Sequence, residues 1–473
     1  MCDSFNFRLN RSESYGQYIY IMQKKLVRLS FITKSITAIA TILASVLIAP
    51  MAWSHVDPEH PLEHRIWHLE QLVEKLSIQL NEESEHRVYS KHEPIEVKLS
   101  GGLKLKTADK KREFQVGGQI AVNHEWIRGA YNADVQNGTL ATANLGDTAQ
   151  KTEMRSFWFR FSGTVDYNWK YQMMFDMNSG RPFMGYIRYQ GFDAGRITIG
   201  KQRESFGLSR FSSGLAAEAS AVSLRMAPLL SMGIAFNGYH DRFTYAFGIF
   251  HEDESDPLAD TDNSEEYAFS TRGTWDPIRE PGDIFHLGLS LSKRDFGGGP
   301  FQMKSRMGAH TIGSFYPVQS ASFNAESGDY IGLEFALVKG PWTVSSELVN
   351  ARIDEFNSPT TYDFTGYFIQ AGHFFGDYTE NFNRKNGRFK RFKPPAGESV
   401  WQLIVRYGDI DLNDAGKGVH DKEFTVGLSW YANRSVRLMG NYTRLKVSGD
   451  DAAAIVGDDT KGETASVRVQ YFF

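Results

Sequence analysis

The sequence predicts an all-β fold, a 16-stranded antiparallel transmembrane β-barrel preceded by a short N-terminal helix of coiled-coil type. Apolar and polar residues alternate in runs of about ten from Phe114 onward, the pattern of strands with one face toward lipid and one toward a polar interior. Aromatic residues, which favour strands, make up 14% of the chain. The C-terminal "ASVRVQYFF" has an alternating apolar face that ends in Tyr471 and Phe473, as expected at a membrane interface.

Period-two alternation defines the individual strands. In "FHLGLSLSKR", for example, Leu287, Leu289 and Leu291 alternate with small, polar or basic residues. We expect sixteen strands, at about 114–126, 155–167, 169–178, 183–190, 195–201, 232–240, 242–250, 265–275, 284–294, 329–338, 342–352, 362–375, 399–410, 421–431, 434–445 and 463–473. An even number lets an antiparallel barrel close with both chain ends on one side. A soluble β-sandwich also alternates, but its inward face is usually aliphatic and its chain shorter.

The N-terminal residues are typical of an exported protein. Residues 1–21 are an upstream extension to which we assign no structural role. Residues 22–54 form a secretory signal peptide, with a basic leader, an uncharged apolar run, and the small residues Ala52 and Ser54 before the cut. An uncleaved anchor is the alternative. The whole chain has 52 Lys and Arg against 56 Asp and Glu, and removal of six basic and two acidic side chains with the leader leaves 46 against 54.

A periplasmic helix and linker are predicted at residues 55–96, ahead of a barrel at 97–473. Apolar residues in "HRIWHLEQLVEKLSIQL" repeat at heptad spacing, which favours association of helices; a helix that lies on its own domain is the alternative. His60, His64 and His68 are spaced by four, as metal ligands on a helix can be. We favour a hydrated helix face and predict no metal there.

Cysteine usage indicates the compartment. Cys2 is the only cysteine and lies upstream of the expected cut, so no disulfide can form in the mature chain. Export without disulfides fits a Gram-negative envelope better than a small secreted domain. We therefore predict a multi-pass β-barrel in the outer membrane of a Gram-negative bacterium, with the N-terminal helix in the periplasm.

Residues opposite in parity to the apolar face are expected to line the lumen. Nine of them are basic: Arg160, Lys170, Arg188, Arg196, Arg272, Arg294, Arg406, Arg437 and Arg468. Five are acidic: Asp166, Asp176, Glu334, Glu347 and Glu423. Because the planar guanidinium of Arg suits bidentate contact with oxyanions, we predict a net cationic lumen. The alternative is that these arginines pair with the acids and only fill a polar interior.

The segment "RKNGRFKRFK", residues 384–393, concentrates positive charge in a protein that is net negative. Its cations are Arg384, Lys385, Arg388, Lys390, Arg391 and Lys393. It follows the twelfth strand, on the periplasmic side, where connections are usually short. We predict that it folds back into the lumen and concentrates anions at a constriction. A solvated charged loop is the alternative, and export argues against a nucleic-acid partner.

Five stretches together resemble the phosphate-selective porin family, porins O and P. They are "GLKLKTADKKREFQVGGQI", "ITIGKQRESFGLSRFSS", "AGHFFGDYTENFNRKNGRFKRFKPP", "WQLIVRYGDIDLND" and "FTVGLSWYANRSVRLMGNYTRL", in the family's order. The resemblance implies a trimeric porin for passive diffusion of small anions, phosphate in its best-known members. It also implies that connections at 202–231, 295–328 and 376–398 narrow the lumen. The first of these is not uniformly basic, so anion preference is better supported than phosphate specificity.

The same resemblance implies the surroundings of the barrel. These are outer-membrane lipid and lipopolysaccharide, together with an assembly machinery that recognises the C-terminal Phe473. The expected assembly is a homotrimer. The expected solutes are small anions, with phosphate or related oxyanions preferred.

Motifs for other functions are weak. His240 stands beside Asp241 at a tight turn with no Ser motif near, and we find no Walker loop, zinc signature or nucleophile elbow. We therefore predict no catalytic residues and no cofactor. Two alternatives remain: a weakly selective general diffusion porin, and an envelope-tethering or adhesive barrel whose N-terminal helix binds a partner.

Overall fold

The computed structural model describes most of the chain beyond the N-terminal region. It covers residues 95–99, 101–130, 135–136, 139–140, 149–208, 230–251, 266–278, 280, 282–313, 315–457 and 460–473, with Gln71, Ser220, Val222 and Met226. All of these except Gln71 belong to the compact unit Glu93–Phe473. The predicted signal peptide, the rest of the heptad segment and its three histidines lie outside the described residues. Within the described part, no helix has the length and apolarity needed to cross a bilayer.

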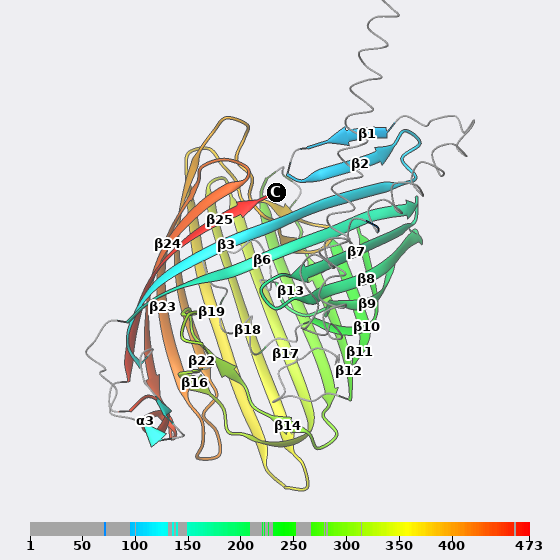
Figure 1. Cartoon of the computed structure of the whole chain (residues 1–473). Helices are drawn as coiled ribbons and strands as arrows, with labels where there is room; N and C mark the ends of the chain where they lie inside the picture. The colour runs from blue at the N-terminus through cyan, green and yellow to red at the C-terminus, as the bar shows by residue number, and fades with distance from the viewer. Residues whose placement is uncertain are drawn as a thin grey trace, which may run out of the picture. The chain divides into compact units, whose positions relative to one another are not determined.

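Sixteen antiparallel strands close into a barrel (Figure 1). In order around the wall they are β3 (Glu113–Gly129), β6 (Ala149–Asp166), β7 (Trp169–Asp176), β8 (Arg181–Phe192), β9 (Gly195–Arg203), β10 (Leu230–His240), β11 (Phe243–His251), β12 (Tyr267–Trp275), β13 (Ile284–Asp295), β17 (Phe323–Lys339), β18 (Trp342–Glu355), β19 (Thr361–Phe375), β22 (Val400–Asp411), β23 (His420–Tyr431), β24 (Val436–Ser448) and β25 (Lys461–Phe472). β25 pairs with β3, from Gly462 opposite Gly129 to Phe472 opposite Gln119, and this pairing closes the sheet. The predicted 16-stranded barrel is confirmed.

The expected strand bounds hold to within a few residues. The largest differences are at β6 and β17, which begin at Ala149 and Phe323 rather than at 155 and 329. Each of these strands follows a long connection. At its start, hydrogen-bonded pairing with the neighbouring strand begins several residues before the hydrophobic alternation in the sequence. Pairing with a neighbouring strand therefore extends them beyond the alternating segment.

The two faces of each strand alternate as the sequence predicted. On β13, Leu287, Leu289 and Leu291 are exposed, whereas His286 and Ser290 are buried. On β13 the outer face is thus apolar and the inner face polar, whereas β19 and β22 also turn buried apolar side chains such as Phe364 and Ile410 inward. Such a wall suits a lipid environment, in which a closed barrel also leaves no unpaired strand edge.

The C-terminal Phe473 is tied to the first barrel strand. The Gly118 N–H donates to a Phe473 oxygen (2.8 Å), and the Phe473 N–H donates to the Gly118 carbonyl (3.2 Å). The Phe473 ring meets the Phe159 ring edge-on, with centroids 5.4 Å apart. Gly118 leaves room for it, because a Cβ there would lie 2.4 Å from a carbon of the Phe473 ring. The chain terminus is therefore part of the barrel wall.

Several short elements that the sequence did not predict lie beside the sixteen strands. The hairpin of β1 (Ile95–Lys98) and β2 (Leu103–Thr107) adds to the start of β3. The others are β4 (Val135–Gln136), β5 (Thr139–Leu140), β14 (Pro300–Phe301), β15 (Lys304–Ser305), β16 (Val318–Gln319), β20 (Phe382–Asn383), β21 (Arg388–Phe389) and the helix α3 (Ala452–Val456). Strands β14 to β16 and the pair β20–β21 give local order to two long connections.

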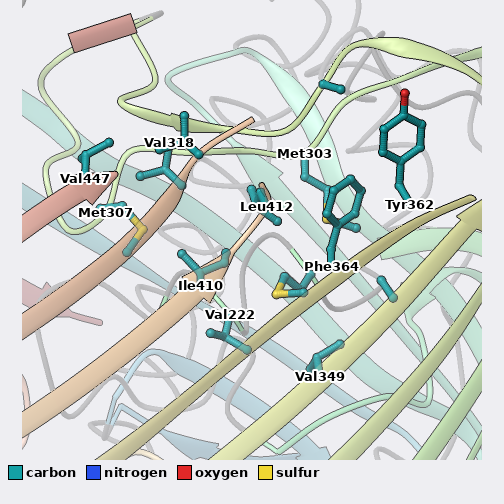
Figure 2. Packing of buried hydrophobic residues seen from close by; sticks show 14 of the residues in the cluster. Val222, Met303, Met307, Val318, Val349, Tyr362, Phe364, Ile410, Leu412 and Val447 are labelled. Carbon is teal, nitrogen blue, oxygen red and sulfur yellow. The ribbon is translucent and has the colours of Figure 1, made fainter. Parts of the chain in front are cut away.

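The connection 296–322, between β13 and β17, packs inside the barrel (Figure 2). Its side chains Met303 and Met307 share an apolar cluster with Ile410 of β22 and Val447 of β24. Burial of these methionines keeps the connection on the inner wall rather than in solvent.

The tip of the same connection is fixed to the strands on the other side of the barrel. The backbone N–H groups of His310 and Thr311 donate to Glu125 of β3 (3.0 and 2.9 Å). The His310 Nδ1 atom lies 2.7 Å from a carboxylate oxygen of Glu153 on β6. The connection thus crosses from β13 and β17 to β3 and β6.

The described residues of the connection 204–229 between β9 and β10, which are 204–208, 220, 222 and 226, also lie inside the barrel. Phe206 is fully buried, and a Cβ on Gly332 of β17 would lie 2.8 Å from its ring. A Cβ on Gly366 of β19 would lie 2.5 Å from the Met226 sulfur. The absence of side chains at these two wall positions is what allows the connection to approach the wall so closely.

Candidate anion pathway

The basic segment 384–393 lies inside the barrel. It belongs to the connection 376–399 between β19 and β22, in which β20 and β21 pair. At its tip, Arg196 of β9 donates to the Asn386 side chain (2.5 Å). Arg272 of β12 donates to the carbonyls of Asn386 (3.1 Å) and Gly387 (2.7 Å). Since β9 and β12 are far from β19 and β22 in the strand order, the segment crosses the interior.

Two of the six segment cations attach the segment to its surroundings. Arg384 donates to the carboxylate of Asp276 (2.8 Å) and to the carbonyls of Ile278 and Asp283, all at the turn end of β12 and β13. Arg388 donates to the Phe206 carbonyl (3.3 Å) and so joins the segment to the connection 204–229. Burial, followed by the charges of nearby arginines, lowers the pKa of Arg388 well below its usual range. Both arginines therefore hold the segment in place.

Arg391 and Lys393 occupy a different environment, in which the other charges are mainly positive. Burial, then Arg160 and Arg437, lowers the pKa of Arg391 to about 10. Burial, then Arg391, Arg160 and Arg434, lowers the pKa of Lys393. We call this group the inner basic cluster and define it as Arg160, Arg391, Lys393, Arg434 and Arg437.

Aromatic rings and a backbone carbonyl hold three of the five members of the inner basic cluster. The Arg391 guanidinium lies 3.8 Å from the centre of the Phe472 ring on β25. Arg437 lies 4.6 Å from the centre of the Tyr431 ring. Arg434 donates to the Pro394 carbonyl (3.1 Å). Cation–π contact restrains a guanidinium without neutralising it, so these side chains are held in place and stay charged.

Three other predicted lumen arginines pair with buried carboxylates. The pairs, with their N···O distances, are Arg272–Glu334 (2.6 Å), Arg294–Glu204 (2.9 Å) and Arg406–Glu423 (3.1 Å). Glu334 also accepts a hydrogen bond from Ser290 (3.1 Å) and contacts His286 Nε2 (3.1 Å). The positive charge of these arginines is balanced inside the wall.

The remaining predicted lumen cations are dispersed. Lys170 of β7 is exposed and stands opposite Arg188 of β8, which donates to Thr198 (2.9 Å). Arg468 of β25 donates to Asn123 of β3. Lys385 and Lys390 of the basic segment are exposed. The structure therefore brings Arg160 and Arg437 together with Arg391 and Lys393, but it does not gather all the predicted cations into one site.

The predicted lumen acids are also divided. Glu334, Glu347 and Glu423 are buried in the barrel. A register shift between Thr164, which lies opposite Lys170, and Asp166 sets Asp166 opposite Trp169 rather than Asn168. Directly opposed residues share a face, so this bulge moves Asp166 away from the face of Lys170. Asp176, at the other end of β7, accepts a hydrogen bond from the Asn178 backbone (3.0 Å).

Three charged residues near the pathway were not among the predicted lumen residues. Arg434 lies in the turn between β23 and β24, Glu204 lies just beyond β9, and Glu380 lies in the connection 376–399. Glu204 and Glu380 stand outside the expected strands, so parity says nothing of them, and Arg434 begins the expected strand 434–445 on the parity opposite to the inward Arg437. The run of cations marked the basic segment, whereas no comparable pattern marks a single charged residue in a turn.

Comparison with known proteins identifies relatives of this chain. A family model described as phosphate-selective porin O and P matches residues 126–473. The chain is 25% identical to Porin O of Pseudomonas aeruginosa over 423 residues, which cover 80% of this chain and 92% of that protein. It is 27% identical to an uncharacterized protein of Caulobacter vibrioides over 162 residues, 33% of this chain and 32% of that protein.

Solved structures with partial likeness include two outer-membrane channels. An anion-selective porin from Comamonas acidovorans matches with a TM-score of 0.46 and 12% identity, over 77% of this chain and 100% of that chain. The channel DcaP of Acinetobacter baumannii matches with a TM-score of 0.49 and 9% identity, over 78% and 99%. The family model spans nearly all of the closed barrel described above. The chain therefore belongs to the phosphate-selective porin O and P family and forms a multi-pass β-barrel channel of the Gram-negative outer membrane.

Proposed function

We propose that the barrel is a water-filled channel through which small anions diffuse passively, with phosphate or related oxyanions preferred. The observation that supports this most is the inner basic cluster, in which Arg391 and Lys393 are electrostatic neighbours of Arg160. Positive charge between low-dielectric walls raises the local concentration of anions. The family's description as phosphate-selective agrees with such a solute.

Within this proposal, the six segment cations have different roles. Arg391 and Lys393 bind the passing anion weakly, together with the other members of the inner basic cluster. The Arg391 Nη1 atom is buried, and no group among the residues described accepts its hydrogen bond, so it can donate to an oxyanion. Arg384 and Arg388 position the segment, and the exposed Lys385 and Lys390 add positive charge. Several weak sites in sequence let an ion leave as readily as it enters.

A weakly selective diffusion pore is the second candidate, and the buried ion pairs favour it. Arg272, Arg294 and Arg406 contribute little net charge to a passing ion because each lies against a carboxylate. The lumen is thus less cationic than the nine predicted basic residues suggest. The two candidates differ in the size of the anion preference, which can be measured.

The test is the zero-current potential of the purified protein in a planar bilayer under a KCl gradient, before and after addition of phosphate. We expect an anion-selective potential and a chloride current that phosphate reduces. Replacing Arg391 and Lys393 together by Gln should lower the anion-to-cation permeability ratio by about three- to tenfold. This estimate follows because one unit charge changes the energy of an ion at a distance of roughly 10 Å by about 1 kcal/mol in a medium of intermediate dielectric constant.

Arg444→Gln is the matched control for that experiment. Arg444 is exposed on the outer face and pairs with Glu463 (2.9 Å), away from the inner basic cluster. This variant should leave the potential unchanged. A near-zero or cation-selective potential of the unmodified protein would contradict the anion channel and favour the general pore.

We also propose how the chain is processed and assembled. The mature protein begins after Ser54, residues 55–96 form a periplasmic helix and linker, and three copies associate in contact with lipid and lipopolysaccharide. The place of Phe473 in the wall supports its recognition during assembly. Intact-mass measurement and chemical cross-linking check both points. A mass that retains residues 22–54, or cross-linking that stops at a dimer, would contradict them.

A further inference from the structure

Glu380 is a buried carboxyl group in the connection 376–399. Only 4% of the residue is exposed. Gln402 of β22 donates from Nε2 to its Oε2 (2.9 Å), and the backbone N–H of Asn381 donates to its Oε1 (3.3 Å). The side-chain oxygen of Gln402, Oε1, accepts a hydrogen bond from the hydroxyl of Tyr431 on β23 (2.9 Å). Glu380 is therefore held against two wall strands.

The charged and titratable groups around Glu380 come from each element packed against it. They are Tyr431 of β23 and Arg437 of β24, with Gln402 as the polar partner on β22. Tyr431 interacts electrostatically with both Glu380 and Arg391. Glu380 thus shares its surroundings with two members of the inner basic cluster, Arg391 and Arg437.

The second carboxyl of this part of the chain is placed differently. Glu398 is exposed and accepts a hydrogen bond from the Tyr378 hydroxyl (2.7 Å). Water around an exposed carboxylate screens its charge, whereas a charge held in a buried site acts over a longer distance. Of these two acids, Glu380 is the one whose ionisation changes the potential at the inner basic cluster.

Burial raises the pKa of Glu380 to about 7. The hydrogen bonds from Gln402 and Asn381 and the charge of Arg437 favour the ionised form but offset the burial only in part. At lower pH the carboxyl is neutral, and the cluster keeps its full positive charge. At higher pH the carboxylate cancels one unit of it.

We propose that Glu380, buried beside the inner basic cluster, is a titratable residue that sets the net charge of that cluster, so that anion preference weakens as pH rises. The inference rests on the proposed function, since it concerns how strongly the same cluster attracts anions. It makes Glu380 a selectivity-determining residue that acts through Arg391 and Arg437 rather than by touching the anion.

Histidines titrate in the same range and would change the charge in the same direction, so the experiment must separate them from Glu380. His286 is buried beside Glu334 at the far end of the basic segment. His373 of β19 packs against the exposed ring of Trp342. A variant of Glu380 removes its own titration and leaves both histidines in place.

The experiment measures the chloride-to-potassium permeability ratio at several values from about pH 5.5 to about pH 8.5. Chloride is the probe because its own charge does not change with pH. We expect the ratio of the unmodified protein to fall by about three- to tenfold with a midpoint near pH 7. Glu380→Gln should keep the low-pH ratio throughout, and Glu398→Gln, the matched control, should follow the unmodified protein.

Each other outcome overturns the inference in a recognisable way. A pH dependence that persists in Glu380→Gln assigns it to another titratable group. An anion-selective protein with no pH dependence leaves the proposed function standing without this regulation. A protein that is unselective at every pH contradicts both. Should Glu380→Gln fail to insert, Glu380→Asp must shift the midpoint and Glu398→Asp must not; an unshifted midpoint rejects the role of Glu380.

Discussion

Arg272 and Arg391 are two arginines inside one barrel whose surroundings give them different properties. Arg272 makes two hydrogen bonds to the carboxylate of Glu334 (2.7 and 2.6 Å) and holds the tip of the basic segment. Arg391 lies against an aromatic ring, and apart from burial its largest influences are two other cations. The residue type is the same, but one charge is balanced and the other is available. A count of lumen arginines alone therefore overstates the field that an ion meets.

The largest effect is expected for Arg272→Met, because it leaves the buried Glu334 without its main counter-charge. We expect a loss of about 3–5 kcal/mol in the free energy of unfolding, measured by urea titration in lipid vesicles. The double variant Arg272→Met with Glu334→Leu should recover most of the loss, since neither charge of the pair is then left buried without its partner. Equal losses in the single and the double variant would mean that Arg272 is not a balanced structural arginine.

Arg391→Gln should change the stability of the protein little but should clearly lower its anion preference. The lost cation–π contact and the relieved repulsion from Arg160 and Arg437 offset each other, so the free energy of unfolding should change by less than about 1 kcal/mol. The anion preference should nevertheless decrease in the bilayer measurement. A stability loss as large as that of Arg272→Met would mean that Arg391 is a structural arginine. The distinction between a balanced Arg272 and an available Arg391 would then be wrong.

The smallest effect is expected for Arg444→Gln, on the exposed outer face. An exposed ion pair such as Arg444–Glu463 contributes about 0–1 kcal/mol, and salt weakens it further. Neither unfolding in urea nor the zero-current potential should differ measurably from the unmodified protein. A clear change in the potential would show that outer-face charge reaches the ion path and would weaken the contrast between the two lumen arginines.

Most of the barrel could be predicted because one physical rule repeats in every strand. A strand between lipid and a polar interior must alternate, so the sequence locates it even without a neighbour to pair with. The rule gives no information where alternation stops. The inward positions of Phe206 and of the connection 296–322 depend on contacts with distant wall residues such as Gly332 and Glu125, which only the folded chain brings near.

The candidate site was predictable in part for the same reason. The run of cations in 384–393 identified the segment, but not that Arg384 would be held by Asp276 while Arg391 would face other cations. Parity placed Arg160 and Arg437 on the inner face. It was inaccurate for Asp166, because a bulge inserts one residue that no composition rule reveals. Glu380 left no trace in the sequence, since its properties arise entirely from burial.

The pairing of β25 with β3 joins parts of the chain that are made far apart in time. Gly129 lies opposite Gly462, and the last residue, Phe473, binds Gly118. Because a closed ring needs every neighbouring pair of strands, the barrel cannot close before β25 reaches β3. Until then, β3 presents an unpaired edge that can join another chain. A chain truncated before β25 should therefore remain an open sheet and aggregate, whereas one that lacks only residues before β1 should still close.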